Sequence, residues 1–165
     1  MRGTPWVRCD VEFATVAQAS KIAPKVLGAL TRPGVRRPLV LRGRSGSGKT
    51  TLLRAAVDES GREAVWCSAI DLAHDMVEAI REGRHEAYRA GLAEDPRALC
   101  VEHLEDLRDR PRTREEVRHM LERAARTRPI LLTLTRARGH VAIARWLRPW
   151  TEIVLLDSPR RAPDP

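Results

Sequence analysis

The feature that most restricts how this chain can fold is a glycine-rich run at residues 43–51, GRSGSGKTT. It fits the pattern of a phosphate-binding loop: a glycine, any four residues, and then Gly-Lys-Ser/Thr. The apolar run 38–42 before it predicts a buried strand, and residues 51–57 after it predict a helix. The alternative is a Gly/Ser-rich surface turn that fits by chance. Because the motif functions at a strand–loop–helix junction, the context favours a nucleoside triphosphate site.

The residues of this loop have distinct predicted roles. The glycines let the backbone curl so that successive N–H groups point at phosphate oxygens, and the helix N-terminus adds positive partial charge. We expect Lys49 to reach the β- and γ-phosphates and the hydroxyl of Thr50 to hold Mg²⁺. The residues predicted to contact ATP in this loop are Gly43, Ser45, Gly46, Ser47, Gly48, Lys49, Thr50 and Thr51.

The length and composition predict one domain in a reducing compartment. With 165 residues the chain can bury a real core, and we expect residues 1–157 to form the domain and the proline-containing tail 158–165 to be disordered. The apolar runs are too short for a membrane span. Cys9, Cys67 and Cys100 have no metal-ligand spacing, which indicates free thiols in the cytoplasm.

The charge of the chain is strongly positive. The net charge is +8, and of the 30 Lys and Arg residues only Lys21, Lys25 and Lys49 are lysines. A basic protein favours a nucleic acid or another polyanion as a partner. The alternative is that a GC-rich genome favours arginine codons, since many of these arginines alternate with Glu and Asp on predicted helix faces. Few aromatic residues are present, and none forms a basic-aromatic stripe typical of base stacking.

Strands and helices alternate along the rest of the chain. Residues 1–13 are irregular and residues 31–34 predict a turn. The predicted strands are 38–42, 64–67, 98–101, 130–134 and 153–156, and the predicted helices beside the one at 51–57 are 20–30, 71–80, 81–91, 113–125 and 141–147. Because the strands are apolar on both faces, this pattern predicts an α/β fold: a doubly wound, five-stranded parallel sheet with helices on both faces.

Several residues are expected to set where the helices begin and end. Pro24 is expected in the first turn of the first helix, where its missing N–H costs little. Asp71 is predicted to be an N-cap. Thr113, with Glu116 three residues later, predicts a capping box, and Pro129 is expected to end that helix.

Hydrolysis would need acidic residues at the end of a neighbouring strand. Glu102 directly follows the apolar run 99–101 and is the candidate for holding the Mg²⁺ shell. His103 occupies the next position, where a second carboxylate would orient water. Glu105 and Asp106 come one turn later and are expected to face elsewhere. The alternative is that Glu102 is an ordinary solvated residue at a strand end.

Two further elements would complete a hydrolytic site. A polar residue at the end of the following strand, Thr133 or Thr135, would point at the γ-phosphate. Arg145 or Arg148 could act as an arginine finger toward a neighbouring subunit.

Residues 11–157 resemble a known family, the nucleotide-binding domain of the bacterial replication initiator DnaA and its regulatory relative Hda, within the AAA+ ATPases. The stretches that carry the resemblance are 39–43 with 48–50, 65–69, 86–89, 98–107, 112–119 and 130–136. The resemblance implies ATP and Mg²⁺ as cofactors, Thr135 as the sensor residue and Arg145 as the finger. Several departures from the family are expected: the paired Walker B acids are here Glu102 and His103, and the sensor position usually held by Asp or Asn is Thr135. The residues after Arg145 need a short insertion to align, and no helical lid or DNA-binding helices are expected after the fifth strand.

The resemblance implies a nucleotide-dependent switch or assembly partner in DNA replication or its regulation, with weak or absent hydrolysis. Two alternatives remain open: an active ATPase subunit of an oligomeric DNA-associated motor or loader, and a nucleic-acid- or protein-binding module with a structural nucleotide site. Expected partners are a second copy, a DnaA-like protein, and single-stranded or duplex DNA through Arg81, Arg84 and Arg89. The alternative for these arginines is pairing with Glu82 and Glu86 on a solvated helix.

Overall fold

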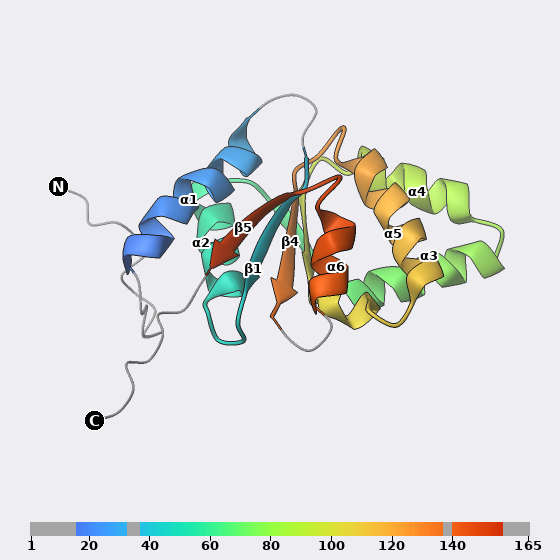
Figure 1. The fold of residues 1–165 in the computed structure, drawn as a ribbon. Coiled ribbons are helices and arrows are strands. Elements are labelled where there is room, and N and C mark those ends of the chain that lie inside the picture. The colour runs from blue at the N-terminus through green and yellow to red at the C-terminus, as the bar shows by residue number, and fades with distance from the viewer. Residues whose placement is uncertain (1–15, 33–36, 137–139, 157–165) are drawn as a thin grey trace.

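The structure is a computed structural model that describes residues 16–32, 37–136 and 140–156 (Figure 1). The segment 1–13 and the tail 158–165 lie outside the described residues, as do residues 33 and 34 of the turn expected at 31–34.

The core of the domain is a parallel sheet of five strands. These are β1 (Leu39–Gly43), β2 (Ala64–Ser68), β3 (Ala98–Glu102), β4 (Ile130–Thr135) and β5 (Glu152–Leu156). Their order across the sheet is β2-β3-β4-β1-β5, and all neighbouring pairs are parallel. The predicted five-stranded parallel α/β fold is confirmed, with each strand within one residue of its expected bounds at either end.

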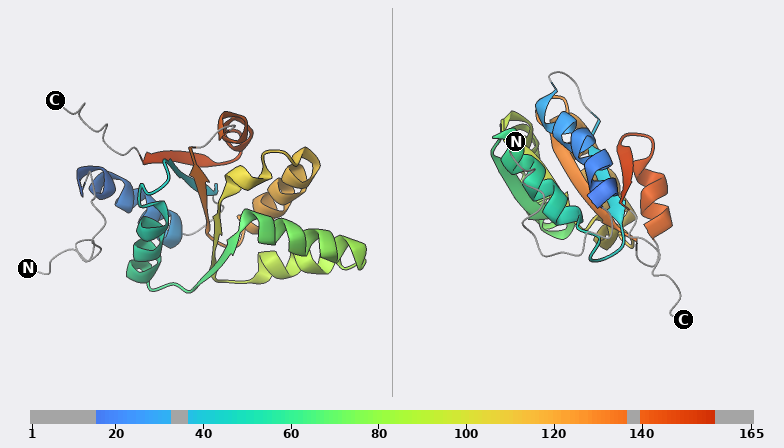
Figure 2. Two further views of the ribbon diagram at one scale, coloured as in Figure 1. Left: turned by 90° about the horizontal axis from the view of Figure 1, so that it is seen from below. Right: turned by 90° about the vertical axis from the view of Figure 1, so that its left-hand side faces the viewer.

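Helices cover both faces of the sheet. One face carries α1 (Val16–Thr31) and α2 (Lys49–Ser60), and the other carries α3 (Ala69–Arg81), the 3-10 helix η2 (Leu104–Leu107), α5 (Pro111–Ala124) and α6 (His140–Leu147). The remaining helix, α4 (His85–Glu94), packs on α3 and α5. In Figure 1 and in the left view of Figure 2, α3 and α4 lie side by side and extend beyond the sheet.

The central strands are buried on both faces, which explains why they appear in the sequence as continuous apolar runs. Leu99 and Val101 pack into the core under α3, α5 and α6, whereas Cys100 between them packs into the core under α1 and α2. Leu132 and Leu131 of β4 divide between the same two cores. Successive residues along each central strand therefore pack into opposite cores, as expected for a parallel sheet between two layers of helices.

The start of α3 differs from the prediction. The helix begins at Ala69, and its N-cap is Ser68, whose Oγ accepts the Asp71 N–H at 3.1 Å. The Asp71 carboxylate in turn accepts the Ser68 N–H at 3.4 Å, which completes a capping box. Asp71 therefore lies at the third helical position, and its prediction as the cap was wrong because the last residue of β2 already caps the helix.

The ends of α5 and α1 also differ from the predictions. Because Pro111 suits the first helical position, α5 begins there, and the predicted capping box at Thr113 was wrong. This helix ends at Ala124, before Pro129. Pro24 lies inside α1 and not in its first turn, since α1 begins at Val16. Burial of apolar side chains on α1, including Val26, stabilises a helix that local propensity alone disfavours.

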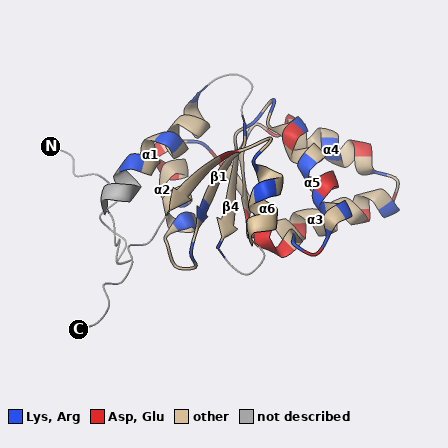
Figure 3. Ribbon diagram, in the orientation of Figure 1, with Lys and Arg blue, Asp and Glu red and all other residues tan. Residues whose placement is uncertain are grey.

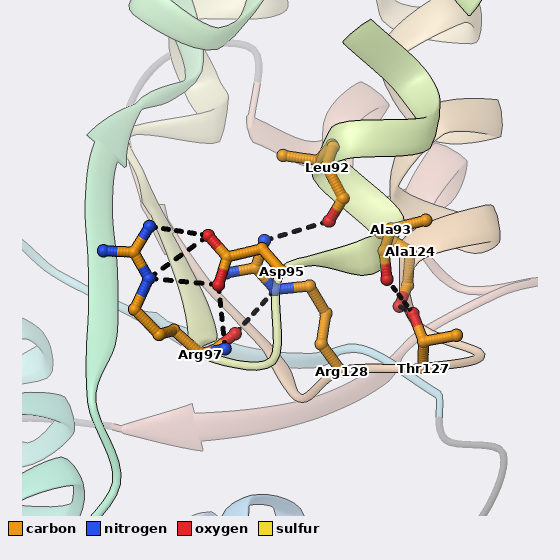
Figure 4. A network of polar contacts seen from close by, with 7 residues as sticks. All are labelled: Leu92, Ala93, Asp95, Arg97, Ala124, Thr127 and Arg128. Atoms are coloured by element: carbon orange, nitrogen blue, oxygen red, sulfur yellow. Dashed lines mark hydrogen bonds and ion pairs between the residues drawn. The ribbon is translucent and has the colours of Figure 1, made fainter. Parts of the chain in front are cut away.

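A buried arginine, Arg128, ties α4 to the amino-terminal edge of the sheet (Figure 4). Its Nε donates to the Arg97 carbonyl at 2.6 Å and its Nη1 to the Leu92 carbonyl at 3.0 Å. Its Nη2 lies 3.7 Å from Asp95, which also forms a hydrogen-bonded ion pair with the Arg97 side chain. Hydrogen bonding from Arg97 lowers the pKa of Asp95 to about 2. The network lies at the opposite edge of the sheet from the phosphate-binding loop, so we interpret it as structural.

Two further expectations concern the cysteines and membranes. Cys67 and Cys100 are free thiols, and Cys9 lies outside the described residues. None of the helices in the described ranges is long and apolar enough to cross a bilayer.

Candidate nucleotide-binding site

The glycine-rich loop connects β1 to α2 and has the backbone shape that its glycines permit. Gly46 and Gly48 have φ values of 72° and 83°, in the left-handed region that residues with a Cβ rarely adopt. At Gly43, a Cβ would lie 2.4 Å from the Leu156 carbonyl oxygen and 2.6 Å from the Ser47 Oγ. Only glycine therefore lets β1 enter the loop this close to the end of β5.

Lys49, the first residue of α2, is folded into the loop. Only 8% of the residue is exposed, and its Nζ donates to the carbonyl oxygens of Gly43 at 3.2 Å and Arg44 at 2.7 Å. Burial lowers the pKa of Lys49, while the nearby carboxylates of Glu105 and Glu102 oppose this shift. The Lys49 amine thus donates hydrogen bonds to two carbonyl oxygens of the loop. It also lies close enough to the loop to bind a phosphate held there.

Thr50 and Glu102 meet across the carboxyl edge of the sheet. The Thr50 hydroxyl, in the first turn of α2, donates a hydrogen bond to the Glu102 carboxylate at the end of β3. Hydroxyl and carboxylate oxygens are the ligand types that Mg²⁺ takes at nucleotide sites. The two residues predicted to hold the metal are therefore brought together, and their donor atoms fit a hard cation.

A cavity of about 260 Å³ opens above the loop. Its lining residues come from the loop, from α2 and from the ends of β3 and β4: Ser45, Gly46, Gly48, Lys49, Thr50, Thr51, His103, Thr133 and Thr135. The predicted residues Gly43, Ser47 and Glu102 lie beside the cavity and not in its lining. Within the described part of the chain, the Ser47 hydroxyl is buried without a hydrogen-bond partner.

His103 has an unusual backbone conformation at the mouth of this cavity. Its φ of 60° and ψ of 48° are left-handed, and it is the one residue other than glycine with a positive φ in the described ranges. Its N–H donates to the Thr133 Oγ1 at 3.2 Å, which anchors the turn to β4. The left-handed turn redirects the chain immediately after Glu102.

Glu105 belongs to the site, and the expectation that it faces elsewhere was wrong. Its Oε2 accepts the backbone N–H of Thr135 at 2.9 Å, and its side chain is 13% exposed. The reason is the left-handed turn at His103, after which η2 folds back over the ends of the strands. Linear spacing along a regular helix or strand gives no signal for this arrangement.

The predicted finger residue lies away from the cavity. Arg145 is exposed on α6 and is not among the cavity-lining residues. Its exposed position leaves the Arg145 side chain able to reach a neighbouring molecule.

The arginines proposed for DNA lie among acidic residues. Basic and acidic residues are interspersed over α3, α4 and α5 (Figure 3). Arg84 forms an ion pair with Glu82. Arg89 binds the carboxylates of Glu86 at 3.1 Å and Glu116 at 2.6 Å, so it joins α4 to α5. Arg81, at the end of α3, is exposed.

Several solved structures share this fold. AMPPCP-bound DnaA from Aquifex aeolicus is 23% identical over 84% of this chain and 45% of its own, with a TM-score of 0.63. A replication initiator DnaA bound to AMPPCP and single-stranded DNA has the same identity and coverage, with a TM-score of 0.60. Domain III of Thermotoga maritima DnaA is 18% identical over 92% of this chain and 66% of its own, with a TM-score of 0.65. The chain thus spans less than half the length of the first two proteins.

The sequence comparison extends this likeness from fold to family. No protein with curated annotation matches the chain significantly. The family model of the bacterial DnaA ATPase domain matches residues 11–141, which include the glycine-rich loop, Glu102 and both sensor candidates. The chain therefore belongs to the bacterial DnaA ATPase domain family.

Proposed function

We propose that this chain is a DnaA-like AAA+ module that binds ATP with Mg²⁺ and acts as a nucleotide-dependent switch or assembly partner in DNA replication or its regulation. The observation that carries the proposal is the hydrogen bond between Thr50 and Glu102 beside the buried amine of Lys49. This arrangement places two candidate Mg²⁺ ligands and a candidate phosphate-binding amine together at the carboxyl edge of the sheet. Parallel α/β proteins bind their ligands at this edge.

Each group in the site has a role in this proposal. Lys49 and the loop N–H groups, including those of Ser45, Gly46, Ser47 and Gly48, bind the phosphates, with Thr51 beside them. Thr50 and Glu102 hold Mg²⁺, which neutralises phosphate charge when bound. Thr135, at the end of β4, contacts the γ-phosphate and so distinguishes ATP from ADP.

We further propose that hydrolysis by the isolated chain is slow. A general base must lie within hydrogen-bond reach of the attacking water. In the described part of the chain, the cavity lining contains no carboxylate, and His103 occupies the position after Glu102. A slow hydrolytic step suits a switch, because the ATP-bound state then persists long enough to engage a partner.

ATP turnover measured over a range of protein concentrations tests this proposal. We expect saturable Mg²⁺-ATP binding and a turnover far below the median enzyme value of about 10 per second. Brisk turnover that is independent of protein concentration would contradict the proposed switch.

The alternative, an active ATPase subunit of an oligomeric DNA-associated motor or loader, is favoured by one observation. The exposed Arg145 on α6 could complete the site of a neighbouring copy as an arginine finger. Turnover per chain would then rise with concentration and fall again in Arg145→Ala. Arg148→Ala tests the other finger candidate in the same way, and the matched control is Arg126→Ala, which removes an exposed arginine after α5.

DNA is a further proposed partner, through Arg81, Arg84 and Arg89. Since Arg84 and Arg89 already pair with carboxylates, DNA binding would have to compete with these pairs. Single-stranded DNA binding should therefore be weak and should weaken further with salt, with a slope of about −0.7 per phosphate contact.

The matching experiment substitutes alanine at 81, 84 and 89 together and measures single-stranded DNA binding at several salt concentrations with ATP present. If this surface is the site, the variant loses affinity and its salt slope becomes smaller. Equal affinity and slope would assign DNA to another surface. No binding by either protein would favour the remaining alternative, a protein-binding module.

A further inference from the structure

We propose that Glu105 is a positioning residue of the nucleotide site, whose carboxylate fixes the end of β4 so that Thr135 meets the γ-phosphate. The inference rests on the proposed ATP site and extends it to a residue outside the phosphate loop. It predicts that Glu105 sets the preference for ATP over ADP without touching either nucleotide.

The first step in the argument is the loss of a strand partner at the end of β4. The β3–β4 ladder runs from Leu99 opposite Ile130 to Val101 opposite Leu132. Beyond it, β3 ends and the chain turns away at the left-handed His103. Thr135 lies three residues past the last of these pairs, where β3 no longer runs beside β4.

Glu105 supplies the acceptor that the strand no longer provides. Its Oε2 lies 2.9 Å from the Thr135 nitrogen, the length of a good N–H···O hydrogen bond. On the opposite side of β4, the Arg136 N–H donates to the Gly43 carbonyl at 2.8 Å. The end of β4 is thus held between the start of the phosphate loop and the Glu105 carboxylate.

The same carboxylate also reaches other parts of the site. Its Oε1 lies 3.4 Å from the His103 Nδ1, and its charge opposes the lowering of the Lys49 pKa by burial. Burial acts to raise the pKa of Glu105, but hydrogen bonds, the Thr135 N–H foremost, leave this pKa below its ordinary value. Glu105 is therefore ionised at neutral pH, and its hydrogen bond to Thr135 is charge-assisted.

Loss of the Glu105 contact should affect recognition of the γ-phosphate alone. His103, Thr133 and Thr135 all line the cavity, and Glu105 contacts two of these three residues. If the end of β4 loosens, the side chain that discriminates the γ-phosphate loses its position, whereas the loop that binds the α- and β-phosphates keeps its own glycine and lysine contacts. ATP affinity should fall while ADP affinity remains.

The test compares Glu105→Ala with Glu105→Gln, using AMPPCP and ADP as probes, each with Mg²⁺. Glutamine keeps an oxygen that can accept the Thr135 N–H, whereas alanine removes it. We expect Glu105→Ala to weaken AMPPCP binding about tenfold or more and ADP binding less than threefold. Glu105→Gln should restore most of the loss. Asp106→Ala, the exposed acidic neighbour, is the matched control and should leave both affinities unchanged.

A second measurement needs no nucleotide. Amide hydrogen exchange at Thr135 should accelerate in Glu105→Ala and remain protected in Glu105→Gln, while exchange at the buried Leu132 stays unchanged. Unchanged exchange at Thr135 would refute the contact itself. Faster exchange with equal loss of AMPPCP and ADP would reduce Glu105 to a structural residue and overturn the positioning role.

A double-mutant cycle links the two residues. In a Thr135→Val background, which keeps the backbone N–H but loses the hydroxyl, Glu105→Ala should no longer change the ratio of AMPPCP to ADP affinity. A full effect in that background would overturn the inference. If the wild-type protein binds neither nucleotide, the proposed ATP function fails and this role of Glu105 fails with it, whereas a selective failure of the Glu105 variants leaves the ATP function intact.

Discussion

Replacing Arg128 with methionine tests whether the buried polar network at the amino-terminal edge of the sheet holds α4 in place. Only 2% of Arg128 is exposed, and its guanidinium donates to the carbonyls of Leu92 and Arg97. Methionine fills much of the same volume but leaves both acceptors without a donor. Each unsatisfied buried acceptor costs about 1–3 kcal/mol, so these two part-buried carbonyls together cost no more than about 2–6 kcal/mol. Since Asp95 keeps its ion pair with the Arg97 side chain, no orphaned charge adds to this cost.

We expect the lower half of that range, about 3 kcal/mol, because the removed guanidinium also no longer has to be desolvated. This is a large share of the 5–15 kcal/mol that typically separates folded and unfolded states. For a domain of this size it corresponds to a fall in Tm of about 6–12 °C.

Urea denaturation followed by circular dichroism measures the loss. Arg126→Met is the matched control, because Arg126 is exposed two residues away and its loss should change the free energy of unfolding by less than about 0.5 kcal/mol. If both variants unfold at the wild-type midpoint with unchanged m-values, the network does not stabilise the fold and the reasoning is refuted.

Three further predictions address the site and the pH response. His103→Asp should raise ATP turnover at least about tenfold, since Asp tolerates the left-handed backbone and adds a carboxylate beside the cavity. His103→Asn tolerates the same backbone but adds no charge, so it should not raise turnover. Equal rates in the two variants would contradict this prediction. Gly43→Ala should weaken ATP binding at least about tenfold by calorimetry, because its Cβ would lie 2.4 Å from the Leu156 carbonyl oxygen; wild-type affinity would show that the loop tolerates the shift. Asp95 has a lowered pKa, so it stabilises the fold above about pH 4 and loses this contribution as the pH falls toward 2. The difference in unfolding free energy between wild type and Asp95→Asn should therefore narrow from pH 5 to pH 2, and a constant difference would contradict the assignment.

The sheet and the phosphate loop could be predicted from the sequence because their signals are local. Continuous apolar runs such as 98–101 occur where a strand is buried on both faces, and residues 43–51 form a motif whose glycines and lysine are fixed by chemistry. The two residues expected to hold Mg²⁺, Thr50 and Glu102, follow from the same logic, since the carboxyl ends of parallel strands meet at one edge.

The helix starts could not be predicted as well, because neighbouring elements compete for the same residues. Ser68 ends β2 and also caps α3, so the acidic residue at 71 was mistaken for the cap. At α5, Pro111 begins the helix before the Thr-x-x-Glu pattern that resembles a capping box. In both cases the helix begins earlier in the chain than the predicted cap, because an upstream residue, Ser68 or Pro111, already suits the helix start.

Glu105 was missed for a different reason. Its position depends on a left-handed residue, His103, that reverses the chain after β3, and no spacing rule for helices or strands anticipates that turn. Its partner is also the backbone N–H of Thr135, and a backbone group is present at every residue except proline, so the sequence does not signal the contact. Contacts of this kind become visible only when the strand ends are placed in three dimensions.

Calorimetric titration of the protein with Mg²⁺-AMPPCP tests the central claim, ATP binding at the glycine-rich loop, most directly. The wild-type protein should bind one equivalent saturably. Lys49→Ala should bind at least about a hundredfold more weakly, because it loses the buried amine that we propose binds the phosphates. Lys25→Ala, which removes an exposed lysine on α1, should match the wild type, and circular dichroism should show that all three proteins are folded. Equal AMPPCP affinity in Lys49→Ala and wild type, or no binding by the folded wild-type protein, would contradict the account.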